Sequence, residues 1–564
     1  SRYSAAAVDD QLTPRQLLER LLANTDLRFE EISPRVIAIV PRPPASGTDS
    51  DTPPTYEEVS VVGRSVTGSR LLRTDLQGAS AVDIISAPDL ARSGSQTLGE
   101  FLKFVPAVSG NSTSTAVSNG GDGTATVTLR GLPANNTLVL INGRRVTFDG
   151  MAGDSVDLNS IPPAAVERIE ILKDGASATY GSDAIAGVVN IILKRDYDGV
   201  QLQQYLGQSS RGDLDTATTS LLWGKRTQRG GLLVSASHYQ QKALFSRDRA
   251  LSASVDGRSR GGTDLRSSAT PNSRITLDGG QVVTLKSRQP GTAPEDFRAA
   301  SAEDLYNYGA ATSSVSPSQR QSIYTHGHYA FNDKLQGTIE ASYTSTESTI
   351  TFASTPLFTA FEEPAVTVAG DNIYNPFGAI TNPNRLPAAL IPGIGAGGAN
   401  VQLEDYRPID IGPRDITVTK DTFRIVTGFK GQFGSWDFDT GFVYSEAKTT
   451  DLTRNRFSLT GLQDAINRTD ATAYNPFNGG CLVTATTSPN NGDCTPSVES
   501  ALDAARIDVS RIGKTSLALA DFKVSKPDLF TLPGGDVGIA LGVEFRRESF
   551  SDDRDDRLDG TITF

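Results

Sequence analysis

The sequence predicts a transmembrane antiparallel β-barrel preceded by small α+β units, and three observations support this prediction. From about residue 199 onward, short segments such as Leu335–Tyr343 and Val537–Phe545 alternate apolar and polar residues. This alternation gives a strand one apolar and one polar face, which suits a wall between lipid and a wet lumen. Tight turns such as Phe331–Asp333 and Phe433–Ser435 lie on one side of these segments, and very long connections lie on the other. No apolar run approaches about 18 residues, so no transmembrane helix is predicted.

The long connections are predicted to be extracellular loops. They fall near residues 250–300, 350–418 and 452–508. Asn375-Pro376-Phe377 and Asn475-Pro476-Phe477 recur within two of them and are interpreted as turn-forming anchors. A large soluble β-sandwich is the alternative, and aromatic residues near the strand ends favour the membrane.

Length and charge exclude some classes of protein. The chain has 564 residues, which is too long for one ordinary compact domain. Its net charge of −12 has the opposite sign to the basic surface that nucleic-acid-binding proteins generally carry, so the charge does not favour that class. The mean hydropathy of −0.26 is compatible with a soluble protein and with a barrel whose lumen-facing positions are polar. The chain starts at Ser1 without a hydrophobic signal peptide, so it is either mature or cut.

The segment Val127–Lys194 is the most informative part of the chain. Leu138–Ile141 is a short apolar strand, and Val146–Phe148 is predicted to be a second one. Asn142-Gly143 between them favours a tight hairpin, because both positions tolerate φ > 0. Upstream, residues 95–105 place Leu98, Phe101, Leu102 and Val105 on one helical face, and Pro106 ends the helix. A small α+β domain with no special role is the alternative interpretation.

The order and spacing of the motifs in this segment resemble the plug domain of TonB-dependent outer-membrane receptors. The resemblance implies that residues 65–198 are a plug and that residues 199–564 are the N-terminal part of the barrel around it. The matching motifs are Leu129-Arg130-Gly131, Leu140-Ile141-Asn142-Gly143, Val166-Glu167-Arg168-Ile169-Glu170-Ile171, Gly175-Ala176-Ser177-Ala178, Tyr180-Gly181 and Ile185–Ile191.

Residues 1–41 predict a small unit of one helix followed by two strands. Thr13-Pro14-Arg15-Gln16 is a capping box with proline in the first turn, and Leu27–Glu30 and Val36–Val40 are the predicted strands. The pattern resembles the second half of the secretin and TonB short N-terminal domain. That resemblance implies an anti-sigma regulator as a further partner. Any small helix–hairpin unit is the alternative.

Residues 42–64 are predicted to be a linker followed by a coupling segment. Pro41–Pro54 is rich in Pro, Ser, Asp and Thr, which marks a flexible connection. A β-prone segment after such a linker can add as a strand to a partner's sheet edge. Its position before the plug resembles a TonB box, which implies TonB and its inner-membrane energising complex as partners. The residues concerned are Glu57, Glu58, Val59, Ser60, Val61 and Val62.

The resemblance also implies residues that lock the plug to the barrel and residues that face the substrate. Arg130 and Arg168 match arginines that pair with inward barrel glutamates. Glu544 is the first candidate partner because Gly542, Glu544 and Arg546 share the polar face of their strand, and Glu340 is the second. The plug loops that would touch substrate contribute Asn111, Ser112, Asn119, Asp122, Asp149 and Met151.

No catalytic constellation and no cofactor site is predicted, so an enzyme is the least favoured class. His326 and His328 share one side of a strand, but two ligands without a third make a weak metal site, and no metal is predicted. Cys481 and Cys494 lie in one Gly/Asn/Pro-rich segment, and an extracytoplasmic loop disulfide is the expected interpretation.

The predicted function is active import of a scarce solute across the outer membrane of a Gram-negative bacterium, with the N-terminus in the periplasm. The solute could be a ferric siderophore, a cobalamin-like cofactor or an oligosaccharide. A signalling receptor that controls transcription through an anti-sigma factor is the alternative. The chain carries about nine or ten candidate strands against about 22 in plugged barrels, so we expect it to be truncated.

Overall fold

The computed structural model describes two units, residues 1–62 and 63–564, which are treated separately below. The residues described are 27–33, 36–41, 64–65, 67, 72–73, 82–108, 123–272, 274–276, 282–285, 297–299, 305–358, 365–479, 495–533 and 535–557.

The first unit contains an antiparallel hairpin of β1 (Leu27–Ser33) and β2 (Val36–Pro41). Both strands were predicted, and both are present. The helix predicted near Thr13 lies outside the described residues.

The plug is built on a five-stranded mixed sheet in the order β5-β8-β9-β6-β7. The central strands β8 and β9 are antiparallel, and β9 pairs with β6 in parallel. Both are almost fully buried, because their runs of Val, Ile and Leu are covered on both faces. The strands are β5 (Val82–Ser86), β6 (Thr137–Ile141), β7 (Arg144–Arg145), β8 (Val166–Leu172) and β9 (Gly187–Leu193); two short strands, β3 (Arg64–Ser65) and β4 (Leu72–Arg73), pair upstream.

The hairpin at Asn142-Gly143 forms as predicted, but the strand after it is shorter than expected. Asn142 and Gly143 have φ of 54° and 78°, the two positive values that a tight two-residue hairpin requires. The returning strand β7 ends at Arg145. Val146–Phe148 was predicted to be a strand, and that prediction is wrong. This segment leaves the plug sheet and bonds instead to Thr515, which lies on the long strand β26 (Arg506–Leu532).

A short helix closes one side of the plug core. In α3 (Leu98–Leu102), the Thr97 side chain caps the start by accepting from the Glu100 backbone N–H at 3.1 Å. Leu98, Leu102 and Val105 are buried, as the predicted helical face requires. The helix is shorter than the predicted 95–105 and is preceded by α2 (Ala87–Ser93).

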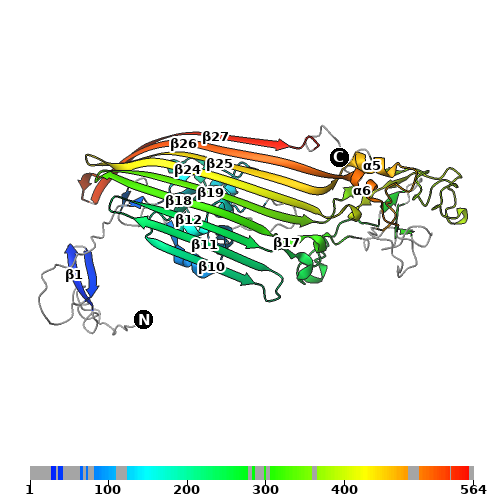
Figure 1. Cartoon of the computed structure of the whole chain (residues 1–564), viewed down its shortest axis with the longest axis horizontal. Helices are drawn as coiled ribbons and strands as arrows, with labels where there is room; N and C mark the ends of the chain where they lie inside the picture. Colours follow the sequence, from blue (N-terminus) through cyan, green and yellow to red (C-terminus); the bar gives the residue numbers. More distant parts are fainter. Residues whose placement is uncertain are drawn as a thin grey trace. The chain divides into compact units, whose positions relative to one another are not determined.

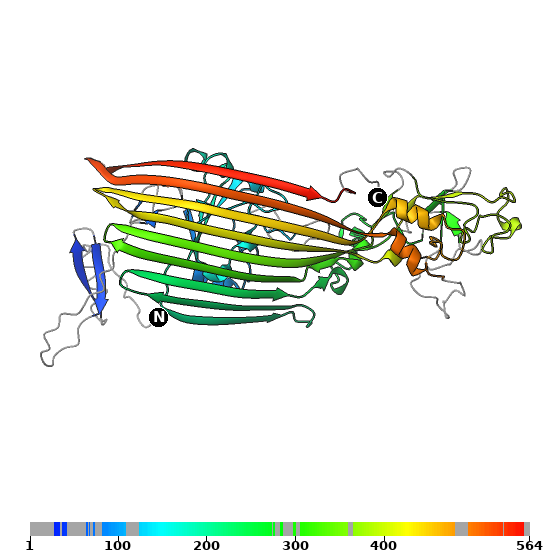
Figure 2. The ribbon, with the colours of Figure 1, turned by 45° about the horizontal axis from the view of Figure 1, so that its top comes forward.

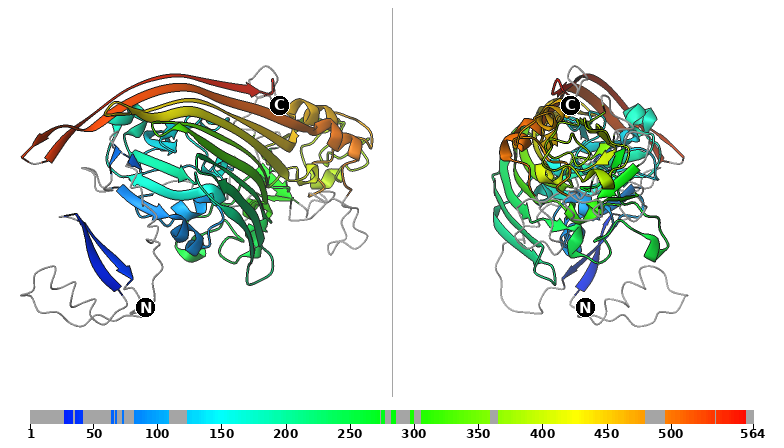
Figure 3. Two further views of the ribbon diagram at one scale, coloured as in Figure 1. Left: turned by 60° about the vertical axis from the view of Figure 1, so that its left-hand side comes forward. Right: turned by 90° about the vertical axis from the view of Figure 1, so that its right-hand side faces the viewer.

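Nine described strands form one antiparallel sheet, which we call the wall. Each strand pairs with the next long strand along the chain, so the sheet is an up-and-down meander and not a sandwich of two sheets (Figure 1, Figure 2). Figure 3 shows the wall curving around the plug elements. The strands are β10 (Gly199–Gln208), β11 (Asp215–Arg226), β12 (Gly230–Gln241), β18 (Ser318–Asn332), β19 (Leu335–Phe352), β24 (Arg414–Phe433), β25 (Trp436–Phe457), β26 (Arg506–Leu532) and β27 (Gly535–Arg554).

The two faces of the wall differ as the alternation predicts. On β19 and β24 the large apolar residues Ile339, Tyr343 and Phe423 are exposed, whereas Glu340 and Arg424 are buried toward the plug. Tyr343 lies directly opposite Phe423, which keeps the apolar side chains on one face. An α+β plug with a large, one-sided antiparallel sheet confirms the predicted fold class.

The three long connections were predicted to be extracellular loops, and their described residues fold together into one structure that we call the cap. They span residues 242–317, 353–413 and 458–505 between consecutive wall strands. Figure 1 shows the cap at one end of the wall strands, with helices α5 (Leu459–Ile466) and α6 (Glu499–Ala505) on it. A five-stranded sheet combines β14 (Arg274–Thr276), β15 (Val282–Leu285) and β16 (Phe297–Ala299) of the first connection with β21 (Thr367–Val368) and β22 (Val401–Leu403) of the second.

Candidate functional site: the interface between plug and wall

The plug contacts the wall in two chemically different ways. Against β11 and β12 the contact is apolar, because Leu222 and Leu233 belong to the same buried cluster as the plug core. On β18, Tyr324 joins that cluster, but Arg320 also donates to the Asn159 side-chain oxygen at 3.2 Å and His326 bonds to the Arg195 carbonyl oxygen. Against β19, β24, β25 and β26 the contact is made by buried polar and charged side chains, which form three clusters. Buried charges are tolerated only when they are paired and hydrogen-bonded, so each cluster has to be complete.

The first cluster joins the plug hairpin to β19 and β24. The Asn142 side-chain amide donates to both carboxylate oxygens of Glu340 at 3.1 Å. Glu340 also pairs with Arg424 at 3.2 Å, and Arg424 donates to the backbone oxygen of Ile141 at 3.3 Å. All three side chains of this cluster are buried. The Asn142 side-chain oxygen accepts from the Leu193 backbone N–H at 2.9 Å. One side chain therefore bonds both to the plug strand β9 and to Glu340 of the wall.

The second cluster centres on Arg144, which lies two residues after Asn142 in the same hairpin. Its Nε lies 2.9 Å from Asp521 on β26, and its Nη2 pairs with Asp439 on β25. Lys523 lies 3.2 Å from the other oxygen of Asp521, so the cluster holds two cations and two carboxylates. Burial would lower the pKa of Arg144, but the carboxylates of Asp439 and Asp521 outweigh it and raise the pKa above its ordinary value.

The third cluster joins the Phe148–Ser155 loop to β24. Lys420 Nζ lies 2.9 Å from Asp149 and 3.5 Å from Asp157, and it also bonds to Thr124. Asp157 accepts from the backbone N–H groups of Ala125 and residue 159, each at 3.0 Å. Burial raises the pKa of Asp157, while the charge of Lys420 opposes that shift. The positive charge of Lys420 therefore compensates the negative charges of two buried carboxylates, Asp149 and Asp157.

Backbone contact reinforces the third cluster. A Cβ added at Gly150 would lie 2.8 Å from the Gly513 carbonyl oxygen and 2.8 Å from the Thr449 nitrogen. A Cβ at Gly513 would lie 2.1 Å from the Gly150 carbonyl oxygen. Two glycines on opposite sides therefore allow plug and wall backbones to touch.

We expect Gly150→Val to unseat the Phe148–Ser155 loop while leaving the wall intact. The added side chain meets backbone atoms that cannot rotate away, so the cost should be about 1 to 3 kcal/mol, as for overpacking. Hydrogen exchange of the assembled protein should show lost protection in residues 146–156. Gly153→Ala is the matched control, because its contact is the flexible ring edge of Phe550 at 2.8 Å, although its φ of 71° adds some strain. Equal losses in the two variants would contradict the proposed backbone contact.

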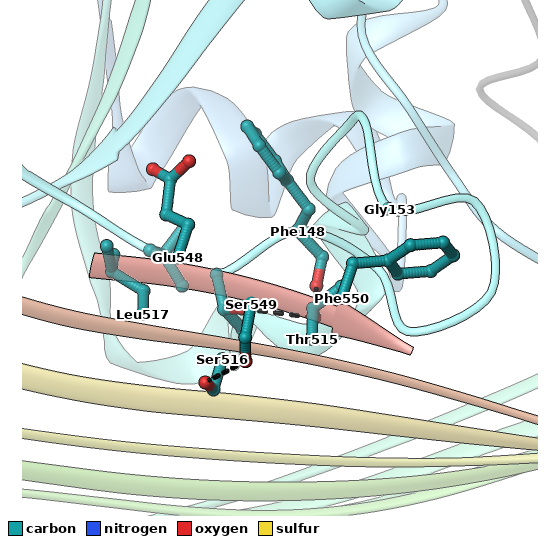
Figure 4. A pocket seen from close by; sticks show the side chains of 10 residues that line it. Phe148, Gly153, Thr515, Ser516, Leu517, Glu548, Ser549 and Phe550 are labelled. Carbon is teal, nitrogen blue, oxygen red and sulfur yellow. Dashed lines mark hydrogen bonds between the residues drawn. The ribbon is translucent and has the colours of Figure 1, made fainter. Parts of the chain in front are cut away.

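A hollow of about 180 Å³ remains between the plug loop and the last two wall strands (Figure 4). Thr515 donates to the Phe148 carbonyl oxygen at 2.6 Å, and Ser516 bonds to Ser549 at 2.7 Å. On this side, hydrogen bonds join the plug to the wall, but side chains do not fill the space between them. The hollow is lined by Val146, Thr147, Phe148, Gly153, Thr515, Ser516, Leu517, Glu548, Ser549 and Phe550.

The predicted lock between plug arginines and Glu544 is not the arrangement seen. Arg168 pairs within the plug, at 2.8 Å from Glu170 and 2.9 Å from Glu167. Arg130 donates to the backbone oxygens of Ile185 and Ala186. Glu544 does face the plug, but the arginines beside it are Arg145 of the plug, at 3.8 Å, and Arg546 of its own strand, at 3.7 Å. The structure therefore corrects the pairing, because Arg168 has a carboxylate two residues away on its own strand.

Two of the predicted substrate-facing residues have a different role in the structure. Asp149 and Met151 are buried, and Asp149 holds Lys420 and caps its own loop through the Met151 backbone N–H at 2.8 Å. The other predicted site residues lie outside the described residues: Asn111, Ser112, Asn119, Asp122, Glu57, Glu58, Val59, Ser60, Val61, Val62, Cys481 and Cys494.

Sequence analysis named Glu340 and Asp149 for other pairings or roles, and it missed the other residues that join plug and wall, although some signals were available. Two arginines, Arg144 and Arg145, directly follow a predicted tight turn, which places them at the tip of an element. Lys420 and Arg424 lie four residues apart on one strand, so both point to the same face. The carboxylate partners of Arg144, Lys420 and Arg424 are more than 80 residues away, and sequence spacing carries no information about them.

Within the part of the chain that the structure describes, no group of three or more His, Cys, Asp and Glu side chains is arranged to hold a metal ion. His326 instead bonds through Nδ1 to the Arg195 carbonyl oxygen at 2.8 Å. In the described residues, no helix is long and apolar enough to span a membrane.

Comparison with known proteins identifies the plug. Residues 75–188 match the family model described as the TonB-dependent receptor plug domain. Similar solved structures include the ferric enterobactin receptor PfeA of Pseudomonas aeruginosa (14% identity, TM-score 0.39, covering 85% of this chain and 55% of that one). The unliganded ferric citrate transporter FecA (14%, 0.37, 85% and 57%) and the ferric preacinetobactin receptor BauA of Acinetobacter baumannii (11%, 0.34, 84% and 61%) are also similar. The chain thus spans little more than half the length of these proteins.

Proposed function

Since this chain is a TonB-dependent receptor by its plug domain, we propose that it imports a scarce solute actively across the outer membrane of a Gram-negative bacterium. The substrate binds from outside to the cap and the plug. TonB takes the segment Glu57–Val62 in the periplasm as an added strand and pulls on it. The pull rearranges the plug, and the substrate passes.

The observation that carries this proposal is the polar character of the plug–wall interface. Three charged clusters, centred on Glu340, Arg144 and Lys420, hold the plug on the β19–β26 side. Charged side chains regain hydration when such an interface opens, whereas an apolar interface would have to expose its whole area to water. A permanently fixed domain would gain more stability from apolar packing. The interface therefore suits a domain that is held firmly and released under load.

The outer face of the wall supports a membrane location. Large apolar side chains project from strand after strand and remain exposed, and a continuous apolar surface of this kind needs lipid rather than water. Its members include Leu202, Leu221, Trp223, Leu232, Ile323, Ile339, Tyr343, Phe423, Phe429, Phe442, Phe522, Leu541, Val543 and Phe545.

The plug also has an anchor suited to receive a pull from the N-terminal side. Thr67 is buried, and its backbone N–H and hydroxyl both donate to Glu170 on β8. The Asn190 amide on β9 donates to the same hydroxyl at 2.9 Å, and Asn190 accepts from the Gly143 backbone N–H at 2.9 Å. A load applied at Glu57–Val62 would reach Thr67 five residues later and enter the plug between its two central strands.

Several parts of this proposal concern the whole receptor. The solute is a ferric siderophore, a cobalamin-like cofactor or an oligosaccharide, and it binds without catalysis in this chain. We retain Asn111, Ser112, Asn119 and Asp122 as proposed substrate-facing residues of the plug. Cys481 and Cys494 are proposed to form a disulfide in the third connection of the cap, which would stabilise that loop by about 3 kcal/mol.

Val61→Pro tests the energy coupling. Proline removes a backbone donor and blocks strand addition, so uptake should stop while substrate binding to cells persists. The measurement compares uptake and surface binding of a labelled substrate by the same cells. Val61→Ala is the matched control, because it keeps the backbone N–H. Normal uptake by the Val61→Pro variant would remove this segment as the TonB-binding strand.

A signalling receptor remains the second candidate, because the chain has a separate N-terminal unit with the β1–β2 hairpin. Deleting residues 1–41 should then abolish transcriptional induction without reducing uptake. Capture of an anti-sigma regulator's periplasmic domain by residues 1–41 would support this role, and unchanged induction after the deletion would exclude it.

A further inference from the structure

We propose that the described residues of the three connections of the cap form one cooperative unit, which is held together by the segment Tyr406–Asp410. The inference does not depend on which solute is imported. Four observations carry it: a shared core, a shared sheet, and two buried polar hubs that lie within five residues of each other.

The cap has one hydrophobic core to which all three connections contribute. Ile275 and Val283 come from the first connection, Val368, Phe377, Val401 and Leu403 from the second, and Leu462, Ile466 and Phe477 from the third; all are buried in one cluster. Ile275 on β14 lies opposite Leu403 on β22, so the sheet also crosses between connections. A loop that leaves this cluster would expose its own apolar side chains and those it covers.

The first hub is Arg407, which ties the second connection to the first. Its guanidinium donates to the carbonyl oxygen of Ala269 at 3.1 Å, to the Ser267 hydroxyl at 3.0 Å and to the Ser354 carbonyl oxygen. The guanidinium carbon also lies 5.0 Å from the centre of the Tyr306 ring. Burial lowers the pKa of Arg407 to about 10, so the group is still charged at neutral pH. The planar guanidinium presents its donors in a fixed fork, which sets the positions of these acceptors, whereas a lysine ammonium is a compact point charge on a flexible stem.

The second hub is Asp410, which ties the second connection to the third. Its carboxylate accepts from the Tyr474 hydroxyl at 2.6 Å and from the Ser497 hydroxyl at 3.2 Å. The Tyr474 hydroxyl in turn bonds to that of Tyr406 at 2.8 Å. Both tyrosines are fully buried. Removing the carboxylate would therefore leave buried donors without an acceptor.

The positions of the two hubs explain why the described residues of the cap form one unit. Arg407 reaches the first connection and Asp410 reaches the third, with only Pro408 and Ile409 between them. The proline limits the backbone freedom of this short segment. Loss of either hub therefore loosens the segment that carries the other, and the three connections cannot open one at a time.

Hydrogen exchange of the full chain in the outer membrane tests this proposal. Arg407→Ala should reduce protection at least tenfold in described stretches of all three connections, such as 267–272, 399–411 and 459–479. Asp410→Ala should do the same, including in the first connection, which it does not touch. Protection in the wall strands should not change, which shows that the variant is inserted and folded.

Arg385→Ala and Asp470→Ala are the matched controls. Arg385 donates only within the second connection, to the carbonyl oxygens of Gly378 and Ile394, and Asp470 bonds to Thr472 within the third. Each control should lower protection near its own site alone. If Arg407→Ala prevents insertion into the membrane, Arg407→Lys should reduce hydrogen-exchange protection in the same three connections, but by a smaller factor. Loss confined to the connection that carries the substitution would overturn the proposal, whether or not the protein transports a solute.

Discussion

Replacing Lys420 with methionine is expected to release the Phe148–Ser155 loop of the plug, at a cost of about 3 to 5 kcal/mol in local stability. Methionine keeps most of the side-chain volume but leaves Asp149 and Asp157 buried without their cation. The loss should appear in hydrogen exchange of residues 146–158 in the assembled receptor. Lys448→Met is the matched control, because Lys448 lies on the neighbouring strand and is exposed. Comparable losses in both variants would mean that the cluster does not hold the loop.

The Lys420→Met deficit should shrink as the pH falls from about 7 to about 5. The pKa of Asp157 is already raised by burial, and removal of the opposing lysine charge should raise it further. A carboxyl whose pKa is higher in the folded state binds more protons there, so its protonation stabilises that state as pH falls. Asn at position 149 should likewise recover part of the loss in a Lys420→Met background. A deficit that is independent of pH and of Asp149→Asn would assign the effect to packing instead of charge.

Glu340→Ala and Arg424→Ala should each loosen the plug hairpin, and the double variant should be little worse than either alone. Each single change leaves a buried charge without its partner, which costs about 3 to 5 kcal/mol. The double change removes both charges, so the effects should be far from additive, with a coupling well above the roughly 0.5 kcal/mol scatter of independent sites. The measurement is exchange protection of residues 138–145 across the four proteins of the cycle.

Asn142 gives this cycle an internal check. Its amide donates to Glu340, and Arg424 donates to the Ile141 carbonyl oxygen, so each single variant also removes a hydrogen bond to the hairpin and the two should have similar costs. Glu347→Gln is the control for a carboxylate on the same strand that is exposed. Additive single effects would mean that the two residues act separately and that the hairpin is held by other contacts.

The sequence alone determined the local elements and the class of the fold. Alternation of the Ile339 and Glu340 type predicts a one-sided strand because successive side chains point to opposite faces. The turns at Asn142-Gly143 and Phe433–Ser435 follow from backbone preferences that belong to those residues themselves. The order of short motifs between Leu129 and Ile191 identified the plug because a family repeats such turns at fixed spacing. These inferences concern neighbours in the chain.

The tertiary structure decided which charges meet and what the long connections become. Arg168 was expected at the wall but found Glu170 two residues away, while Arg144 and Lys420 found carboxylates hundreds of residues distant, at Asp521 and Asp149. The connections were predicted only as loops; in the structure, apolar residues from all three are buried in one cluster, and Arg407 and Asp410 bond the connections to one another. Pairing of buried charges and cooperative burial both depend on distances through space, which a sequence pattern does not contain.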